Sequence, residues 1–312
     1  GGSGFLGSAL VRRLVLIGND VVVLDNGSRG SIKRLESILD QITYIEGDIR
    51  DAETVKEATK GCQILFHLAF INGTKFFYEK PELVLDVGVK GALTTLEEAK
   101  RCGVETYILA SSSEIYQQPE TIPTSETERA IIPDVLNPRF SYAGGKLISE
   151  LLSINYLRDT SIRDVIFRPH NVFGPNMGFE HVIPEIIRKL SNATNKWLKD
   201  SGEIEIQGTG LETRSFCFVE DAVDQLITIY NGGKKGEIYH VGIDNEITIN
   251  HLIESISAIL NLRVKILPGS LKSGGTTRRC PDISKIKSIG YTGKDRFLEG
   301  LRETVNWYKH VF

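Results

Sequence analysis

A glycine-rich segment at the start of this 312-residue chain constrains its fold more than any other feature. The segment reads Gly1-Gly2-Ser3-Gly4-Phe5-Leu6-Gly7, and apolar residues recur at helical spacing over 8–17 directly after it. A glycine loop that opens a helix lets the backbone approach a phosphate, and the helix N-terminus favours the negative charge. The segment therefore predicts a nucleotide-binding βαβ unit, although many glycine loops bind nothing.

A short apolar strand with an acidic end follows this helix. Residues 21–24 are Val-Val-Val-Leu, and Asp25 stands about 20 residues beyond the loop, where an acidic side chain accepts hydrogen bonds from the adenosine ribose. A carboxylate repels a 2′-phosphate, so we expect NAD rather than NADP. The competing interpretation of Asp25 is a solvated turn residue. Because no strand precedes Gly1, we also expect apolar residues upstream in the natural protein.

Strand-like and helix-like stretches alternate through the first half of the chain. We expect strands at 21–25, 42–45, 64–67, 106–110 and 165–167. We expect long helices at 83–100 and 142–157. This alternation predicts the α/β class with a doubly wound parallel sheet of the Rossmann type. The later pieces are shorter, so we expect a cofactor domain over 1–170 and a smaller mixed α/β substrate domain over 171–312, with some chain crossing back.

Composition and charge argue against several classes of function. The net charge of −3 provides no basic stripe for nucleic acid. The four cysteines lie far apart with no Cys-x-x-Cys pair, so neither a zinc site nor a disulfide framework is expected. No apolar run reaches the ~18 residues of a membrane span. We therefore expect a cytoplasmic protein with no metal, nucleic-acid or membrane partner.

Hydroxyls, a carboxylate and a Tyr-Lys pair flank a Pro-containing loop expected over 117–138. The strand expected at 106–110 runs into Ser111–Tyr116, and ligands of doubly wound sheets bind at such strand ends. Tyr142 and Lys146 are four residues apart, on one face of the expected helix. A nearby ammonium lowers the pKa of a phenol, which makes Tyr142 a candidate base for a sugar hydroxyl. Taken alone, this spacing is more often an ordinary surface pair.

Taken together and in this order, these motifs resemble the extended short-chain dehydrogenase/reductase family, in particular its NAD-dependent nucleotide-sugar epimerases and dehydratases. The resemblance implies a catalytic set of Ser112, Glu114, Tyr142 and Lys146. It implies an NAD site formed by Gly1, Gly4, Phe5, Leu6, Gly7, Asp25, Asp48, Ile49, Leu68, Ala69, Tyr142 and Lys146. It implies substrate contacts from Ser113, Asn171, His181, Arg214 and Arg279, although either arginine could instead form a surface ion pair. A nucleotide-diphosphate sugar substrate and a homodimer through helices 83–100 and 142–157 are further implications.

The reaction implied by the resemblance passes through a transient 4-keto sugar, whose fate the sequence leaves open. Glu114, in Ser112-Ser113-Glu114, modestly favours 4,6-dehydratase-like or decarboxylase chemistry over a simple 4-epimerase, unless it only binds the neighbouring loop. A net keto-sugar reductase and a non-catalytic sugar-nucleotide-binding protein are the remaining alternatives.

Two positions depart from the pattern of the family that the chain resembles. Gly88 stands where many members of that family have Asn, and Gln117 replaces the usual Gly. These departures make the substrate less certain than the fold.

Overall fold

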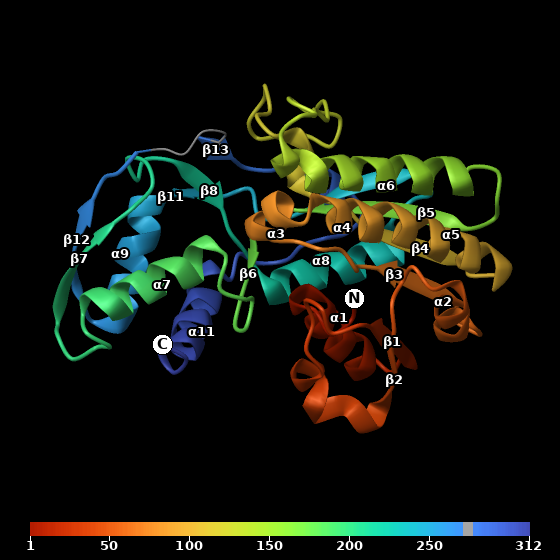
Figure 1. Cartoon of the computed structure of the whole chain (residues 1–312), viewed down its shortest axis with the longest axis horizontal. Helices are drawn as coiled ribbons and strands as arrows, with labels where there is room; N and C mark the ends of the chain where they lie inside the picture. The colour runs from red at the N-terminus through yellow and green to blue at the C-terminus, as the bar shows by residue number, and fades with distance from the viewer. Residues whose placement is uncertain (271–276) are drawn as a thin grey trace.

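The computed structural model describes residues 1–270 and 277–312, and it consists of two parts packed side by side (Figure 1). The first part is a parallel sheet covered by helices on both faces, and the second is a smaller mixed α/β part. This architecture confirms the predicted α/β class with a Rossmann-type sheet. No helix among the described residues is long and apolar enough to cross a membrane.

The sheet part contains most elements of the first half and two that return later. Its helices and strands are α1 (Phe5–Leu16), β1 (Val21–Asp25), β2 (Ile42–Glu46), α2 (Ala52–Thr59), β3 (Ile64–His67), α3 (Thr74–Glu79), α4 (Pro81–Leu85), α5 (Gly91–Arg101), β4 (Thr106–Ala110), α6 (Ser141–Leu157), β5 (Arg163–Pro169), α8 (Val219–Gly232) and β10 (Glu237–Val241). A π-helical turn, Asp86–Lys90, joins α4 to α5. The single helix expected at 83–100 is therefore one rod with an irregular middle.

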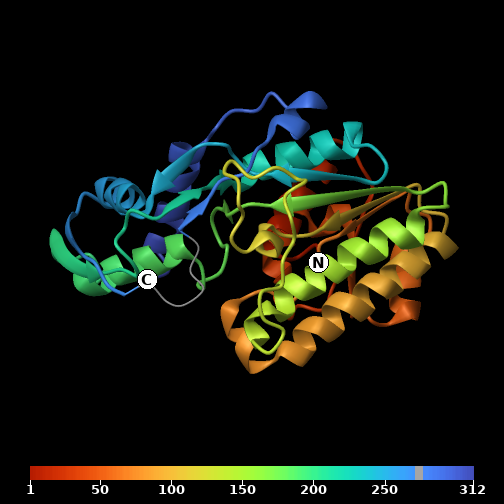
Figure 2. The same ribbon diagram turned by 90° about the horizontal axis from the view of Figure 1, so that it is seen from above.

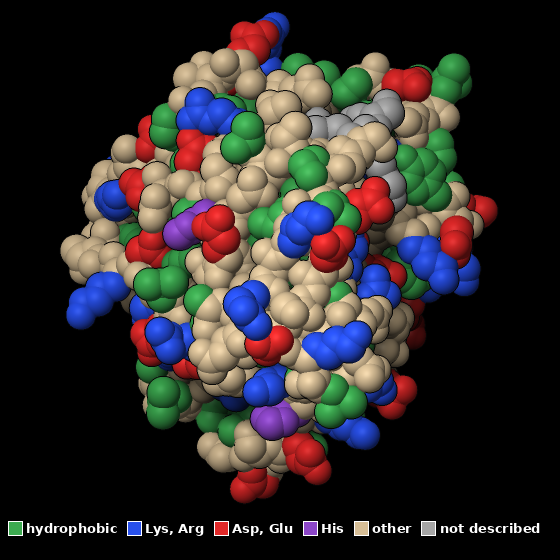
Figure 3. Space-filling model, turned by 90° about the vertical axis from the view of Figure 1, so that its left-hand side faces the viewer, with side chains coloured by type: hydrophobic (Ala, Val, Ile, Leu, Met, Phe, Trp, Pro, Cys, Tyr) green, Lys and Arg blue, Asp and Glu red, His purple; other side chains and the backbone are tan. Residues whose placement is uncertain are grey.

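The second part, as far as its residues are described, is built from short strands and three longer helices. Its elements are β6 (Val172–Phe173), α7 (Val182–Ala193), β7 (Ser201–Glu205), β8 (Thr213–Ser215), β9 (Cys217–Phe218), β11 (Glu246–Thr248), α9 (Ile249–Leu260), β12 (Arg263–Leu267), β13 (Arg278–Arg279), α10 (Ser284–Ser288) and α11 (Phe297–Lys309). Figure 3 shows its outer face, where acidic and basic side chains are interspersed. Ion pairs such as Lys265–Glu203, 2.9 Å apart, join β12 to β7. Such exposed pairs add little stability.

Within the first part, the parallel strands are divided between a sheet of order β2–β1 and a sheet of order β3–β4–β5–β10. The Gly1 backbone lies where β1 and β3 end: its amino group donates to the Leu24 carbonyl at 2.5 Å, and a Cβ built on Gly1 would lie 2.5 Å from the Ala69 nitrogen. The glycine loop therefore lies at the carboxyl ends of both strands. β10 pairs in parallel with β5, so the second half of the chain supplies an edge strand of the larger sheet.

Helices cover both faces of the larger sheet and bury its inner strand β4 throughout. α5 and α6 lie on one face, and α8 lies on the other, packed against α1 (Figure 2). Every residue of β4 is buried, as expected for a strand covered on both sides. The largest buried apolar cluster contains Leu10 of α1, Phe167 of β5, Leu226 of α8 and Leu252 of α9. The two parts thus share one core, which holds the walls of the cleft between them in place.

Candidate active site

The catalytic candidates gather where β4 ends and α6 begins. Ser112 follows β4 and caps a 3₁₀ turn, Ser113–Tyr116, in which its hydroxyl accepts the Glu114 N–H at 3.1 Å. Glu114 lies in this tight turn, which sets the direction of its side chain. Tyr142 lies in the first turn of α6, and Lys146 follows one turn later. The structure thus brings together the four side chains singled out in the sequence.

Tyr142 and Lys146 are both buried, and each has a defined partner. The Ser112 hydroxyl hydrogen-bonds the Tyr142 side chain. The Lys146 ammonium donates to the Ala110 carbonyl at 2.6 Å and lies 5.9 Å from the centroid of the Tyr142 ring. A hydroxyl, a phenol and a cation are therefore held within one small volume at the edge of the sheet. Such a set can remove a proton from a sugar hydroxyl and return it.

Burial determines the charge state of this pair. It raises the pKa of Tyr142 to about 12, even though the Ser112 hydrogen bond acts in the opposite direction. It also lowers the pKa of Lys146 to about 7, against the opposing effect of Glu150. We expected Lys146 to lower the pKa of Tyr142, but in the structure the pKa of Tyr142 is raised, because desolvation is the largest effect on both groups. A neighbouring group that stabilises the Lys146 cation would therefore also help to lower the pKa of Tyr142.

A groove lined by the glycine loop leads to these residues. Gly1, Gly4, Phe5, Leu6 and Gly7 line a cavity of about 620 Å³ that also contains Ser112, Tyr142 and Lys146. A Cβ built on Gly7 would lie 2.2 Å from the Gly1 carbonyl oxygen, so the loop can be this compact only with glycine there. The N-terminus of α1 opens from this loop and favours a phosphate. The groove fits a dinucleotide cofactor.

The far end of the groove contains most of the predicted ribose and adenine contacts. Asp25, Ile49, Leu68 and Ala69 line a smaller cavity there. The Asp25 carboxylate already accepts the N–H groups of Ser3 at 3.0 Å and Gly27 at 2.9 Å, which fixes its direction. A carboxylate held in this way can accept the hydroxyls of a ribose.

Asp48 differs from the other predicted cofactor residues, because its carboxylate is bound by Arg50 at 2.7 Å. These hydrogen bonds lower the pKa of Asp48 to about 2. Asp48 does not line the cavities described above, whereas its neighbour Ile49 does.

Arg29 is a groove residue that was not singled out in the sequence. It lines both cavities and forms an ion pair with Glu180 at 3.6 Å. Its place shortly after the acidic strand end was the signal available in the sequence.

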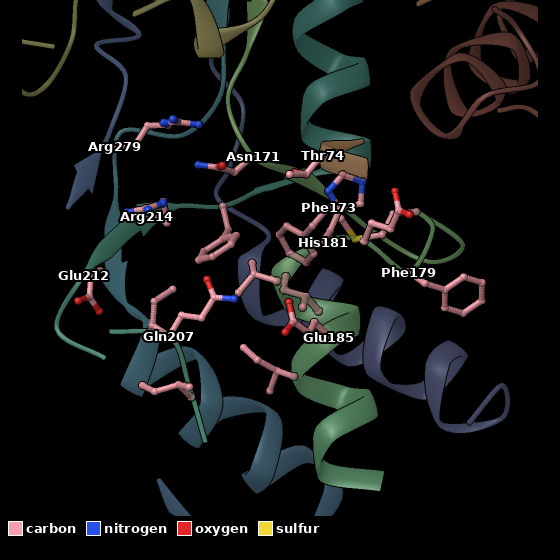
Figure 4. Close-up of a pocket in the computed structure, with 18 of the residues that line it drawn as sticks. Thr74, Asn171, Phe173, Phe179, His181, Glu185, Gln207, Glu212, Arg214 and Arg279 are labelled. Carbon is pink, nitrogen blue, oxygen red and sulfur yellow. The ribbon is translucent and has the colours of Figure 1, made fainter. Parts of the chain in front are cut away.

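A larger cavity of about 910 Å³ opens from the groove towards the second part of the chain. Four of the residues expected to contact the substrate line it: Asn171, His181, Arg214 and Arg279. Figure 4 shows the two arginines on one side of this cavity and His181 on the other. Asn171, His181 and Arg279 also line the glycine-loop cavity, so the two cavities form one continuous cleft. Ser113 lies on the glycine-loop side of that cleft.

Glu114 is the acidic centre of a group of arginines in this cleft. Its Oε1 atom accepts a hydrogen bond from Arg279 at 2.5 Å. Burial alone would raise the pKa of Glu114, but the charges of Arg279, Arg139 and Arg214 lower it overall. Arg139, which also lines both cavities, was missed in the sequence and is marked there only by its closeness to Tyr142. At this point of the cleft, the ionised Glu114 carboxylate is therefore influenced by three neighbouring arginine cations.

A buried polar network lies behind the catalytic residues and ties α6 to the sheet. Glu150 of α6 pairs with Arg168 of β5 through two hydrogen bonds of 2.9 and 2.7 Å. Arg168 also donates to the Tyr116 hydroxyl at 2.5 Å, and that hydroxyl contacts the His240 Nε2 atom at 2.7 Å. The pair is almost fully removed from water, at 4 and 6 % side-chain exposure. It fixes the helix that supplies Tyr142 and Lys146.

The fold and the site together define a Rossmann-type enzyme in which a glycine-lined dinucleotide groove leads to a Ser-Tyr-Lys set. The model of the NAD dependent epimerase/dehydratase family matches residues 1–242, and the chain belongs to this family of NAD-dependent enzymes.

Individual members of the family resemble the chain over nearly its whole length. UDP-glucuronic acid decarboxylase 3 of Arabidopsis thaliana is 31 % identical over 96 % of this chain and 85 % of its own. The structure of UDP-N-acetylglucosamine 4-epimerase from Methanobrevibacter ruminantium matches with a TM-score of 0.87 at 27 % identity, over 100 % of this chain and 97 % of that one. A dTDP-glucose 4,6-dehydratase from Streptomyces venezuelae, solved with NAD bound, matches with a TM-score of 0.86 at 26 % identity, over 99 and 95 %.

Proposed function

We propose that this enzyme removes the C6 carboxylate of a nucleotide-diphosphate uronic acid through a transient 4-keto sugar. The observation that carries the proposal is the group of Arg139, Arg214 and Arg279 around Glu114 in the cleft. Two phosphates of a nucleotide sugar do not by themselves require three guanidinium groups beside the catalytic residues. A sugar carboxylate gives these cations a further anionic partner, because guanidinium groups bind carboxylates through paired hydrogen bonds.

The proposed steps use Ser112, Tyr142 and Lys146 around the sugar C4 position. Bound NAD would supply a reversible acceptor for the hydride of C4. Tyr142 takes the proton of the C4 hydroxyl, Ser112 donates a hydrogen bond to the same oxygen, and the Lys146 cation stabilises the phenolate. The resulting C4 ketone is β to the C6 carboxylate. The C5–C6 bond then breaks, carbon dioxide leaves, and the electron pair moves through C5 towards the C4 oxygen.

Two proton transfers complete the cycle. A solvent proton enters at C5, and Tyr142 later returns its proton to the C4 oxygen when the hydride is restored. The net change is replacement of the carboxylate by a hydrogen atom, with no net oxidation of the cofactor.

The protonation state of Glu114 favours decarboxylation over 4,6-dehydration. Expulsion of a C6 hydroxide requires a proton donor, but Arg279 holds Glu114 in its ionised form. Its neighbour Ser113 offers only a hydroxyl. Departure of carbon dioxide requires no acid. The likeness to a UDP-glucuronic acid decarboxylase supports the same choice.

A 4-epimerase is the second candidate, favoured by the room in the cleft. Cavities of about 620 and 910 Å³ adjoin at the catalytic residues, so a keto sugar could turn over between the two hydride transfers. The likeness to a 4-epimerase structure supports this alternative.

The test is to incubate the NAD-loaded enzyme with UDP-glucuronic acid and with UDP-glucose in deuterated water and to identify the products by NMR. Decarboxylation predicts carbon dioxide and one deuterium at C5 of the product. Inversion at C4 without carbon dioxide would establish the epimerase, and a 6-deoxy-4-keto product with deuterium at C5 and no carbon dioxide release would establish a dehydratase. Arg279→Met should raise the KM for the uronic acid about tenfold or more, because a charged hydrogen bond is lost. The exposed Arg263→Met serves as the matched control.

We further propose that residues 1–170 bind the cofactor and that residues 171–312 bind most of the substrate.

We also propose that the protein is a cytoplasmic homodimer. The dimer face would be formed by α5 and α6. On α6, Ile148 is 40 % and Leu151 55 % exposed, which is unusual for apolar side chains on a helix covering a sheet. Light scattering after size-exclusion chromatography tests the dimer, and Leu151→Glu should shift it to monomer.

A further inference from the structure

The aromatic ring of Phe70 lies against both members of the proton-transfer pair. Phe70 follows Leu68 and Ala69 in the cofactor groove. The Lys146 ammonium lies 4.1 Å from the centroid of its ring. The Tyr142 ring lies 5.2 Å away, centroid to centroid, at an interplanar angle of 82°. One side chain thus covers the cation and contacts the phenol edge to face.

Two glycines make room for this ring. A Cβ built on Gly88 would lie 2.4 Å from the Phe70 Cζ atom, and one built on Gly145 would lie 3.0 Å from it. Gly88 belongs to the π-helical turn and Gly145 to α6, so the ring is held between two helical segments. A side chain at position 88 would displace it. Gly88 is the position where the sequence departs from the Asn of many relatives, and the Phe70 ring fills the space beside it.

Among the described residues, few other groups stabilise a positive charge on Lys146. The Ala110 carbonyl accepts one of its hydrogen bonds. Glu150, one turn further along α6, raises the pKa of the ammonium. His67, which faces it from β3, is kept neutral because burial lowers its pKa to about 3. The electron-rich face of an aromatic ring attracts a cation most strongly where water is excluded.

We propose that Phe70 is a positioning residue for proton transfer, whose ring keeps Lys146 cationic in a dry site and fixes the orientation of Tyr142. The ring acts through Lys146, because a cation beside the phenol lowers the pKa of Tyr142. The inference rests on Tyr142 being the base of the proposed function. It is independent of whether the 4-keto sugar is decarboxylated, dehydrated or epimerised.

The test replaces Phe70 by mono-, di- and trifluorophenylalanine, which preserve its shape but withdraw electron density from the ring face. The pKa of Lys146 is followed by NMR on NAD-loaded protein with isotope-labelled lysine side chains, with the signal assigned from Lys146→Met. We expect the pKa to fall with each fluorine, by on the order of one unit in total. If the enzyme has a Lys146 pKa near 7, turnover at pH 7 then falls about fivefold, with KM unchanged.

Phe77 provides the matched control, because it stacks on Tyr142 at 4.9 Å rather than over the ammonium. Its fluorination should leave the pKa of Lys146 unchanged. Phe70→Leu, which keeps the site apolar but removes the ring, should lower that pKa like the fluorinated variants. A pKa that does not follow the number of fluorines, or that responds equally to both rings, would overturn the proposal. The NMR result is decisive even if neither nucleotide sugar is turned over, so failure of the proposed function is recognised separately.

Discussion

Lys146 should make the folded protein less stable, and replacing it by methionine should reveal by how much. The residue is only 3 % exposed, and burial lowers its pKa from an ordinary 10.5 to about 7. The unfolded chain therefore binds more protons than the folded one between these two values, so wild-type stability rises with pH in that window. The penalty from this one group is about 4 kcal/mol at pH 7 and about 2 kcal/mol at pH 9.

Methionine at this position carries no charge, so the variant should lack that pH dependence. Lys146→Met also loses the hydrogen bond to the Ala110 carbonyl, but this cost is the same at both pH values. We therefore expect the stability of the variant relative to wild type to fall by about 2 kcal/mol between pH 7 and pH 9. Urea unfolding at several pH values measures this difference.

The exposed Lys265→Met is the control and should show no such change with pH. If the difference between Lys146→Met and wild type is the same at pH 7 and pH 9, the argument that burial destabilises this cation is wrong. The variant should have no turnover in either case, which would make Lys146 a residue retained for function at a cost in stability.

Three further changes test the groove, the base and the buried network. Tyr142→Phe should lower turnover about 10²–10⁴-fold while bound NAD is retained, as measured by product formation and cofactor content; undiminished turnover would exclude it as the base. Gly7→Ala should weaken NAD binding about tenfold or more in calorimetry, because its methyl group overlaps the loop backbone. Arg168→Met should destabilise the protein by about 3–5 kcal/mol in urea unfolding, because it leaves the Glu150 carboxylate buried and unpaired. The control Lys265→Met, which removes an exposed ion pair, should cost less than about 1 kcal/mol. Equal losses of stability in the two variants would contradict this reasoning.

Local pattern was sufficient where a segment has a single environment. The strands at 21–25, 64–67 and 106–110 have the bounds expected from their apolar runs, because each is buried along its length or ends at a turn. By contrast, β7 covers Ser201–Glu205, and its register is set by pairing with β12. Ile204 is the only large apolar residue of β7, so its own sequence could not determine these bounds.

The sequence by itself determined the glycine loop, the acidic strand end and the placement of Tyr142 and Lys146 on one helical face. Each depends on neighbours a few residues away, whose spacing fixes their geometry. Only the tertiary structure decided that Arg279, 165 residues from Glu114, pairs with it, and that Phe70 fits beside Gly88 over the Lys146 ammonium. Contacts between distant segments and the exclusion of water arise only when the chain is packed, and they determine the charges on which this site depends.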